Sequence, residues 1–256
     1  MKKKILSLCL VLALAAVAVV GGTLAYFTDT DEATNTFTTA NVEIDLIEKQ
    51  RNEDSTDLEN FEDGKVLMPI VGSAQGDSEE VGGVSGLPTA ENYVDKIMTI
   101  KNLAVDAYVR LYVAIPTALD NVGDAGQNIL HFNWNTASAA EGEWRNEVCV
   151  AQNVNVNGVQ CNVYYRTYST ALAKDAATAT PAYIGFYLDK HVNYNNETGM
   201  YTITRNGVTE DINFDFSDGV TIPVYAVGVQ AAGFTDADAA VDEAFGANFN
   251  PWAANN

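Results

Sequence analysis

Residues 108–115 alternate between two kinds of side chain, and this alternation constrains the fold more than any other feature of the chain. A period of two is typical of a β-strand whose two faces meet different surroundings. The run consists of Val109, Leu111, Val113 and Ile115 with Tyr108, Arg110, Tyr112 and Ala114 between them, and it ends at Pro116. The pattern predicts a strand within a sheet.

Similar segments recur along the chain, separated by turn residues and with almost no helical periodicity between them. They are residues 96–101, 129–135, 161–169, 182–189, 200–205, 208–216 and 220–229. Asn206-Gly207 joins two of these segments and is typical of a tight β-hairpin turn. Strands at this spacing predict an all-β fold, an antiparallel β-sandwich of jelly-roll-like topology.

One short helix is expected near the C-terminus. Thr235 and Asp238 fit a capping box, Asp236 suits the first turn, and Gly246 ends the helix. Residues 47–93 are rich in acidic residues, glycine and serine, and we expect them to form an acidic loop insertion. No internal repeat is visible, so residues 26–256 are expected to form a single domain.

The first 25 residues have the composition of an export signal. Lys2, Lys3 and Lys4 precede an apolar run over residues 5–20, and small residues follow. This predicts cleavage between Ala25 and Tyr26, which leaves a secreted or cell-surface protein. The alternative is an uncleaved membrane anchor, because residues 5–25 are just long enough to cross a bilayer. The membrane is therefore expected as a partner only through an uncleaved signal.

The charge of the chain limits its partners. Once the three lysines leave with the signal, the remaining 11 basic and 34 acidic residues give a formal charge of −23. Such a charge excludes nucleic acid and anionic membrane surfaces as expected partners. Calcium is the one cofactor considered, although no acidic cluster fits an EF-hand loop. The clusters are Asp29 with Asp31, Asp211 with Asp215 and Asp218, and Asp236 with Asp238 and Asp242.

Two cysteines, Cys149 and Cys161, lie outside the signal on segments that could pair as a hairpin. A loop centred on Asn155 would set them opposite one another, and an exported protein would then form a disulfide. A two-residue turn at Asn157-Gly158 would instead set Cys161 opposite Val154. The two thiols would then stay unpaired and mostly buried.

The sequence argues against catalysis. Its two histidines, His131 and His191, are not in a His-Glu-x-x-His arrangement, and no Gly-x-Ser-x-Gly motif is present. We therefore predict no catalytic and no metal-ligating residues. A binding module for glycans or other ligands is a further alternative, with Trp134, Trp144 and Trp252 as its candidate aromatic platform.

The start of the mature chain resembles the TasA/camelysin family of bacterial surface and biofilm-matrix proteins. In that family a Tyr/Trp-Phe-Ser/Thr-Asp start is followed by Asn-x-Phe and a short alternating strand, and a glycine precedes that strand. The matching residues here are Tyr26, Phe27, Thr28 and Asp29, then Asn35 and Phe37, then Val42, Ile44 and Leu46. Ala40-Asn41 stands where the family has glycine, and residues 96–110 and 222–230 are similar to two further strand segments.

The resemblance implies export, trimming by a SipW-like signal peptidase, and assembly of a jelly-roll subunit into extracellular fibres. In this family the new N-terminal strand of one subunit is thought to complete the sheet of the next. The expected partners are therefore a second copy of the chain, arranged head to tail, and other matrix proteins. Camelysin is also associated with a metalloprotease activity, which remains a second alternative.

The resemblance assigns different roles to the two parts of residues 26–46. Tyr26, Phe27 and Phe37 are expected to be the large side chains of the donated strand, which would fill pockets of the neighbouring subunit. Val42, Ile44 and Leu46 are expected to belong to the core of their own subunit. An ordinary first strand over the whole segment is the simpler alternative.

Overall fold

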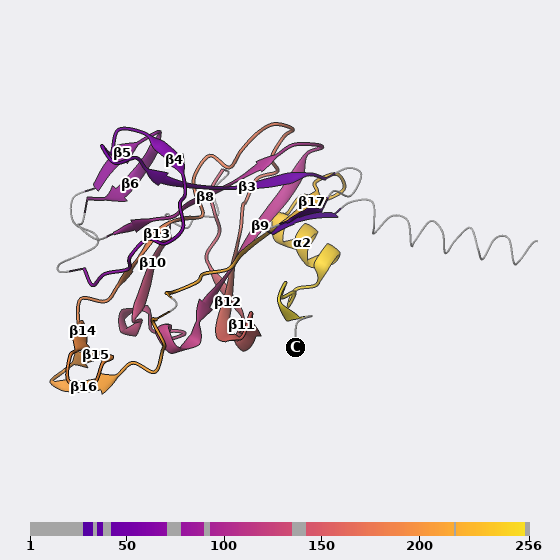
Figure 1. Ribbon diagram of the computed structural model, residues 1–256. Coiled ribbons are helices and arrows are strands. Elements are labelled where there is room, and N and C mark those ends of the chain that lie inside the picture. Colours follow the sequence, from indigo (N-terminus) through magenta and orange to yellow (C-terminus); the bar gives the residue numbers. More distant parts are fainter. Residues whose placement is uncertain are drawn as a thin grey trace, which may run out of the picture.

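A six-stranded antiparallel sheet forms one layer of the computed structural model (Figure 1). The structure describes residues 28–32, 35–37, 42–70, 78–89, 93–134, 142–217 and 219–253. Expected cleavage residues Ala25 and Tyr26, and with them Phe27, lie outside these ranges. The order of the sheet is β11 (Val148–Val156), β12 (Val159–Thr167), β9 (Ala107–Pro116), β17 (Val224–Gln230), β1 (Thr28–Glu32) and β2 (Asn35–Phe37).

Two three-stranded sheets form the facing layer. One has the order β4 (Leu58–Asn60), β3 (Ile44–Arg51) and β8 (Ile97–Asn102), and the other β10 (Leu130–Trp134), β13 (Tyr183–Leu188) and β7 (Val94–Asp95). Buried side chains from both layers form one core, with Val109 and Leu111 of β9 against Ile44, Ile100 and Phe186. The predicted all-β sandwich is thereby confirmed.

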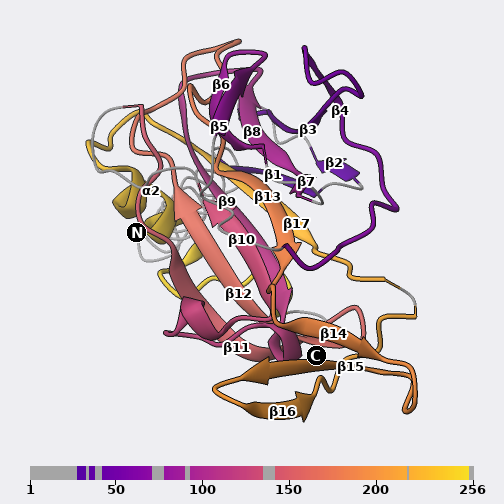
Figure 2. The ribbon, with the colours of Figure 1, turned by 90° about the vertical axis from the view of Figure 1, so that its left-hand side faces the viewer.

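The remaining strands and the helix lie outside the two layers of the sandwich. A third three-stranded sheet of β14 (Val192–Asn195), β15 (Met200–Arg205) and β16 (Val208–Asp211) projects from one end (Figures 1 and 2). β5 (Ser78–Val81) and β6 (Val84–Pro88) form a separate hairpin, and the helix α2 spans Ala237–Phe245. Two 3-10 turns, η1 (Thr117–Leu119) and η2 (Ala125–Gln127), follow β9.

The helix α2 covers the outer face of the six-stranded sheet, so β9 is buried on both of its faces. All ten residues of β9 are buried. Its odd-numbered residues face the core between the layers, whereas Tyr108, Tyr112 and Ala114 pack in a second cluster with Ala240 and Val241 of the helix. The alternation in the sequence therefore separates two cores rather than a core and a solvent face.

Arg110 is the charged member of this outer cluster and is fully buried. Its guanidinium donates to Asp238 Oδ1 at 2.9 Å and to Asp242 Oδ1 at 2.8 Å, and its Nε donates to Thr167 Oγ1 at 2.8 Å. The guanidinium also lies 4.1 Å from the centroid of the Tyr165 ring. These contacts compensate the lost hydration of a buried charge and fix the helix over β9.

The N-terminal end of α2 differs from the sequence prediction. Asp236, rather than Thr235, is the N-cap: its backbone is extended and its side chain accepts from Ala239 N at 3.0 Å. An aspartate at this position satisfies one of the unpaired N–H groups of the first turn. Gly246 ends the helix at a φ of 96°, as predicted.

The expected acidic loop at residues 47–93 is wrong for much of this segment, because β3 continues to Arg51 and β4, β5 and β6 follow. The β5–β6 hairpin has its own small core, in which Val81 and Leu87 pack against Ile97 and Ile184. Two cations neutralise carboxylates of the acidic segment: Arg51 pairs with Glu79 at 2.5 Å and Lys96 pairs with Glu48 at 2.7 Å. Such tertiary contacts override the loop-like composition.

Neutralising both carboxylate partners of Arg110, by Asp238→Asn with Asp242→Asn, should cost about 3 kcal/mol of unfolding free energy, because it leaves a buried charge without a counter-charge. The measurement is urea denaturation followed by circular dichroism. Glu243→Gln is the matched control, since Glu243 is an exposed carboxylate on the same helix. A double variant as stable as that control would contradict the role of the buried ion pair.

Candidate functional site

The N-terminal strand β1, part of the segment 26–46 that the sequence analysis considers for strand exchange, pairs with one edge of β17. β17 pairs with β9 through seven residues, from Val224 opposite Val113 to Gln230 opposite Ala107. Its other edge pairs with β1, from Thr28 opposite Val229 to Glu32 opposite Tyr225. β2 pairs only with β1 in the described part of the sheet and contains Phe37, which lies opposite Thr30.

Small residues on the core side of β17 allow the two layers to approach at this edge. Ala226 and Gly228 are buried on that side, and a Cβ at Gly228 would lie 2.9 Å from side-chain carbons of both Val42 and Ile44. Val42 and Ile44 are fully buried in the main core, and Leu46 packs against it partly buried. The residues expected to form a first-strand core therefore lie directly beneath the β1–β17 edge.

This geometry makes the edge dependent on β1. Without β1, β17 would present unpaired N–H and C=O groups beside the apolar Val42 and Ile44. An open sheet edge of this kind is a ready template for a strand from another chain. The arrangement can thus bind an extended peptide segment by main-chain hydrogen bonds.

Gly228→Ala should destabilise the protein by about 1–3 kcal/mol, because the added methyl group must displace Val42 and Ile44 in a packed core. Thermal or urea unfolding measures this loss. Gly126→Ala is the control: the nearest atom to its added Cβ, Asp124 Oδ1, is 3.6 Å away. Equal stability of the two variants would contradict the close approach at Gly228.

The structure brings the two histidines together at a single carboxylate, a juxtaposition that the sequence does not reveal. His131 Nε2 lies 2.9 Å from Asp189 Oδ2, and His191 Nδ1 lies 2.8 Å from Asp189 Oδ1. Arg205 approaches the same carboxylate at 3.4 Å. Burial raises the pKa of Asp189, but the hydrogen bonds from His191 and His131 outweigh it and lower the pKa to about 2. Asp189 thus links β10, β13 and the projecting sheet.

Among the described residues, no group of three or more His, Cys, Asp or Glu side chains could hold a metal ion. Asp236 and Asp238, which with Asp242 form one of the clusters considered for calcium, pair with Arg145, which donates to Asp236 Oδ2 at 2.7 Å. Asp218 lies outside the described residues.

A pocket of about 280 Å³ beside His131 contains a pair of carboxyl groups, Asp120 and Glu147. Tyr164 donates its hydroxyl to Asp120 Oδ2 at 2.6 Å, and Asn162 donates to the same oxygen at 2.8 Å. Although Glu147 is an exposed residue, partial desolvation of its carboxyl group raises the pKa to about 7, against the opposing effect of Arg166 and with a further rise from Asp120. Glu147 can therefore exchange a proton near neutrality. Asp120, His131 and Tyr164 line the same pocket, but no group of three or more His, Cys, Asp or Glu side chains among the described residues could hold a metal ion there.

Glu147→Gln should remove a pH-dependent loss of stability. The folded pKa is raised above the unfolded value of about 4.3, so the folded state binds the proton more tightly and stability falls as the pH rises from about 4.3 to 7. Between pH 4 and pH 8 we expect the original protein to lose about 1–2 kcal/mol relative to the variant, after allowance for solvent screening. Urea denaturation at both pH values measures the difference, and parallel pH profiles would contradict it.

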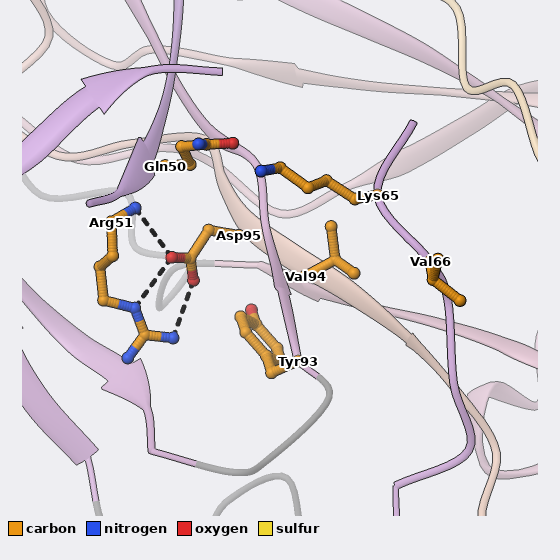
Figure 3. Close-up of a pocket in the computed structure, with 7 residues that line it drawn as sticks. All are labelled: Gln50, Arg51, Lys65, Val66, Tyr93, Val94 and Asp95. Atoms are coloured by element: carbon orange, nitrogen blue, oxygen red, sulfur yellow. Dashed lines mark hydrogen bonds and ion pairs between the residues drawn. The ribbon is translucent and has the colours of Figure 1, made fainter. Parts of the chain in front are cut away.

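A second pocket of about 280 Å³ lies between β3, β7 and the segment after β4, and is drawn in Figure 3. Arg51 faces it but forms a two-pronged ion pair with Asp95, in which Nε and Nη2 donate at 2.8 and 2.9 Å. Its remaining Nη1 donates to Glu79 at 2.5 Å. Because the guanidinium is already occupied, this pocket offers no arginine fork to an anionic ligand.

The cysteines follow the second alternative drawn from the sequence. The hairpin turns at Asn157-Gly158, which sets Cys161 opposite Val154 and Cys149 opposite Tyr164. The suggested disulfide between Cys149 and Cys161 is therefore not formed, and both thiols are free. Burial raises the pKa of Cys161 to about 11, which makes its thiol unreactive near neutral pH.

Trp144 and Trp252, two of the three tryptophans considered for an aromatic platform, are buried. Trp144 is fully buried and donates its indole N–H to Thr180 O at 2.8 Å, and Trp252 is 3% exposed beneath the six-stranded sheet's outer cluster. Trp134 ends β10, and its side chain is outside the described part of the structure. The expectation is wrong for Trp144 and Trp252 because their large apolar surfaces are used in the two cores.

No helix among the described residues is long and apolar enough to cross a membrane. Comparison with curated proteins and with solved structures found no match. A family model described as camelysin metallo-endopeptidase matches residues 1–68. This stretch contains the expected signal, β1, β2 and β3, the segments that resemble TasA and camelysin in the sequence. Residues 1–68 are thus similar to the camelysin family model.

Proposed function

We propose that this chain is a non-enzymatic structural subunit of an extracellular fibre or biofilm matrix, assembled by exchange of its N-terminal strand. The observation that carries the proposal is the position of β1 on the edge of β17, over the buried Val42 and Ile44. β1 is joined to the rest of the fold through the sheet edge that a strand from another copy would occupy. The family match to the same residues adds support.

The exchange would follow export. While the signal tethers the chain, β1 pairs with its own β17. Cleavage between Ala25 and Tyr26 frees the N-terminus, and β1 can then pair with β17 of another copy through the same five residue pairs. Tyr26, Phe27 and Phe37 would add side-chain contacts to these main-chain bonds. A head-to-tail contact of this kind does not close on itself, so it builds a filament.

The expected partners are those of an exported matrix subunit: a second copy, a SipW-like signal peptidase and other matrix proteins. The formal charge of −23 after cleavage keeps the free subunit soluble and disfavours binding to nucleic acid. Calcium between acidic surfaces of neighbouring subunits is a compatible addition. The protein would act in the matrix or at the cell surface.

A peptidase is the second candidate, because the matching family model is described as a metallo-endopeptidase. Zinc catalysis needs three protein ligands and a water-activating carboxylate. Both histidines are engaged by Asp189, and Arg205 places a positive charge beside that carboxylate. These contacts favour the structural role over the catalytic one.

Residues 26–256 should form filaments, whereas residues 41–256 should remain monomeric, because the shorter chain has no strand to donate. Negative-stain microscopy and light scattering distinguish the two results, and circular dichroism establishes that the shorter chain is folded. Folded monomers from both chains would overturn the proposal. Casein cleavage by the purified monomer, abolished by chelation, would favour the peptidase instead.

A reversible disulfide that holds β1 in its own subunit provides the control for the truncation. Thr30 lies opposite Val227, so Thr30→Cys with Val227→Cys can form a disulfide that holds β1 in its own subunit. The oxidised variant should stay monomeric and the reduced variant should form filaments. The single variant Thr30→Cys is the control for disulfides that the new cysteine could form with Cys149 or Cys161. Filaments from the fully oxidised double variant would exclude exchange of β1.

A further inference from the structure

We propose that the projecting sheet of β14, β15 and β16 carries a binding pocket for a quaternary ammonium group, such as that of choline. The pocket has a volume of about 520 Å³ and lies between β14, β15 and the segment that follows β16. The sheet that lines this pocket projects from the end of the molecule away from α2 (Figures 1 and 2). This site is independent of the proposed strand exchange.

Aromatic rings form a continuous row along the pocket. Tyr194 lies opposite Tyr201 in the β14–β15 pair, and their ring centroids are 5.1 Å apart. The ring centroids of Tyr201 and Phe216 are 4.5 Å apart, and those of Phe216 and Phe214 are 4.9 Å apart. The row begins with the exposed Tyr194 and continues into partly buried rings that pack against the main core. A ligand can therefore reach it from solvent.

The backbone holds the row in place. Ile212 N donates to Tyr201 O at 2.8 Å, and Phe214 N donates to Ile212 O at 2.9 Å. These bonds bring the segment after β16 back across β15, so that Phe214 and Phe216 reach Tyr201. Four aromatic side chains from three segments of the chain are thereby held together before any ligand binds, which reduces the entropy cost of binding.

The charge of the pocket selects a cation. Asp215 is the one charged side chain among the described residues that line it, and no lysine, arginine or histidine accompanies it there. The Asp215 carboxylate accepts from Ser217 N at 2.9 Å, and this bond lowers the pKa of Asp215, so it is ionised at neutral pH. The strongly negative chain adds an attractive field for cations and repels anions.

An alkylated ammonium fits this combination better than a simple cation or an anion. Aromatic rings attract a cation through their quadrupoles, and quaternary ammonium groups are the ligands recognised by clusters of such rings. The methyl groups of the ligand also suit the apolar Met200, which lines the pocket and is 41% exposed. Since a quaternary nitrogen carries no N–H donor, it needs no hydrogen-bond acceptor buried among the rings.

The test is a titration of residues 26–256 with choline chloride, followed by NMR of methyl-labelled methionine. We expect a saturable shift of the Met200 signal, with Met68 as a reference outside the pocket. The neutral isostere 3,3-dimethylbutanol should bind at least about tenfold more weakly, because it lacks the charge that the rings and Asp215 attract. A second titration uses a peptide that contains Nε-trimethyllysine. Comparison of its affinity with that of choline shows whether the pocket prefers a quaternary ammonium group on a protein or on a small molecule.

Substitutions of the pocket residues test whether choline binds there. Tyr194→Leu should weaken choline binding at least about tenfold, Tyr194→Phe should retain it, and Asp215→Asn should weaken it by a factor of about 3 to 10. Asp211→Asn is the charge control, since Asp211 is an exposed carboxylate at the end of β16 that does not line the pocket. None of these variants should change filament formation.

Three results would overturn the inference. Equal binding of choline and its neutral isostere would mean that the pocket is merely apolar. Binding of neutral oligosaccharides with no response to choline would make it a glycan site. No saturable shift with choline or the trimethyllysine peptide, in a folded protein, would mean that the aromatic row has a structural role only.

Discussion

The buried ion pair between Arg110 and the helix carboxylates of Asp238 and Asp242 is the interaction on which the rest of the structure depends. A fully buried guanidinium on a central strand would be costly alone, and its two carboxylates, Thr167 and Tyr165 remove that cost. The pair holds α2 against the sheet. Because the helix is there, the outer face of β9 becomes a second core, and the six-stranded sheet is buried on both sides near its centre.

Because both faces of the six-stranded sheet are covered near its centre, a strand from another chain could pair with it only at an edge. β9 is enclosed between β12 and β17, so it cannot pair with another chain. β17 has one edge held by β9 and one held by the short strand β1. β9, which is buried on both faces, and the short strand β1 therefore flank the same strand, β17.

The sequence predicted the features that depend on local pattern. The alternation in β9, the turn at Asn206-Gly207 and the helix end at Gly246 are each determined by a few adjacent residues. What it could not predict depends on distant partners. His131 and Asp189 are 58 residues apart, and the β5–β6 hairpin packs against Ile184 of β13. The aromatic row escaped prediction because Phe214 and Phe216 were assigned to a strand, whereas β16 ends at Asp211.

The short link between β2 and β3 limits how far a subunit can extend its N-terminal strands. Val42 is fully buried in its own core, and five peptide steps separate it from Phe37, a reach of about 17 Å at full extension. β2 pairs with β1, so the two strands would move together as a hairpin. If the strands are donated as proposed, the neighbour that receives them must lie in direct contact with the donor, and the resulting fibre would be stiff with a short axial repeat.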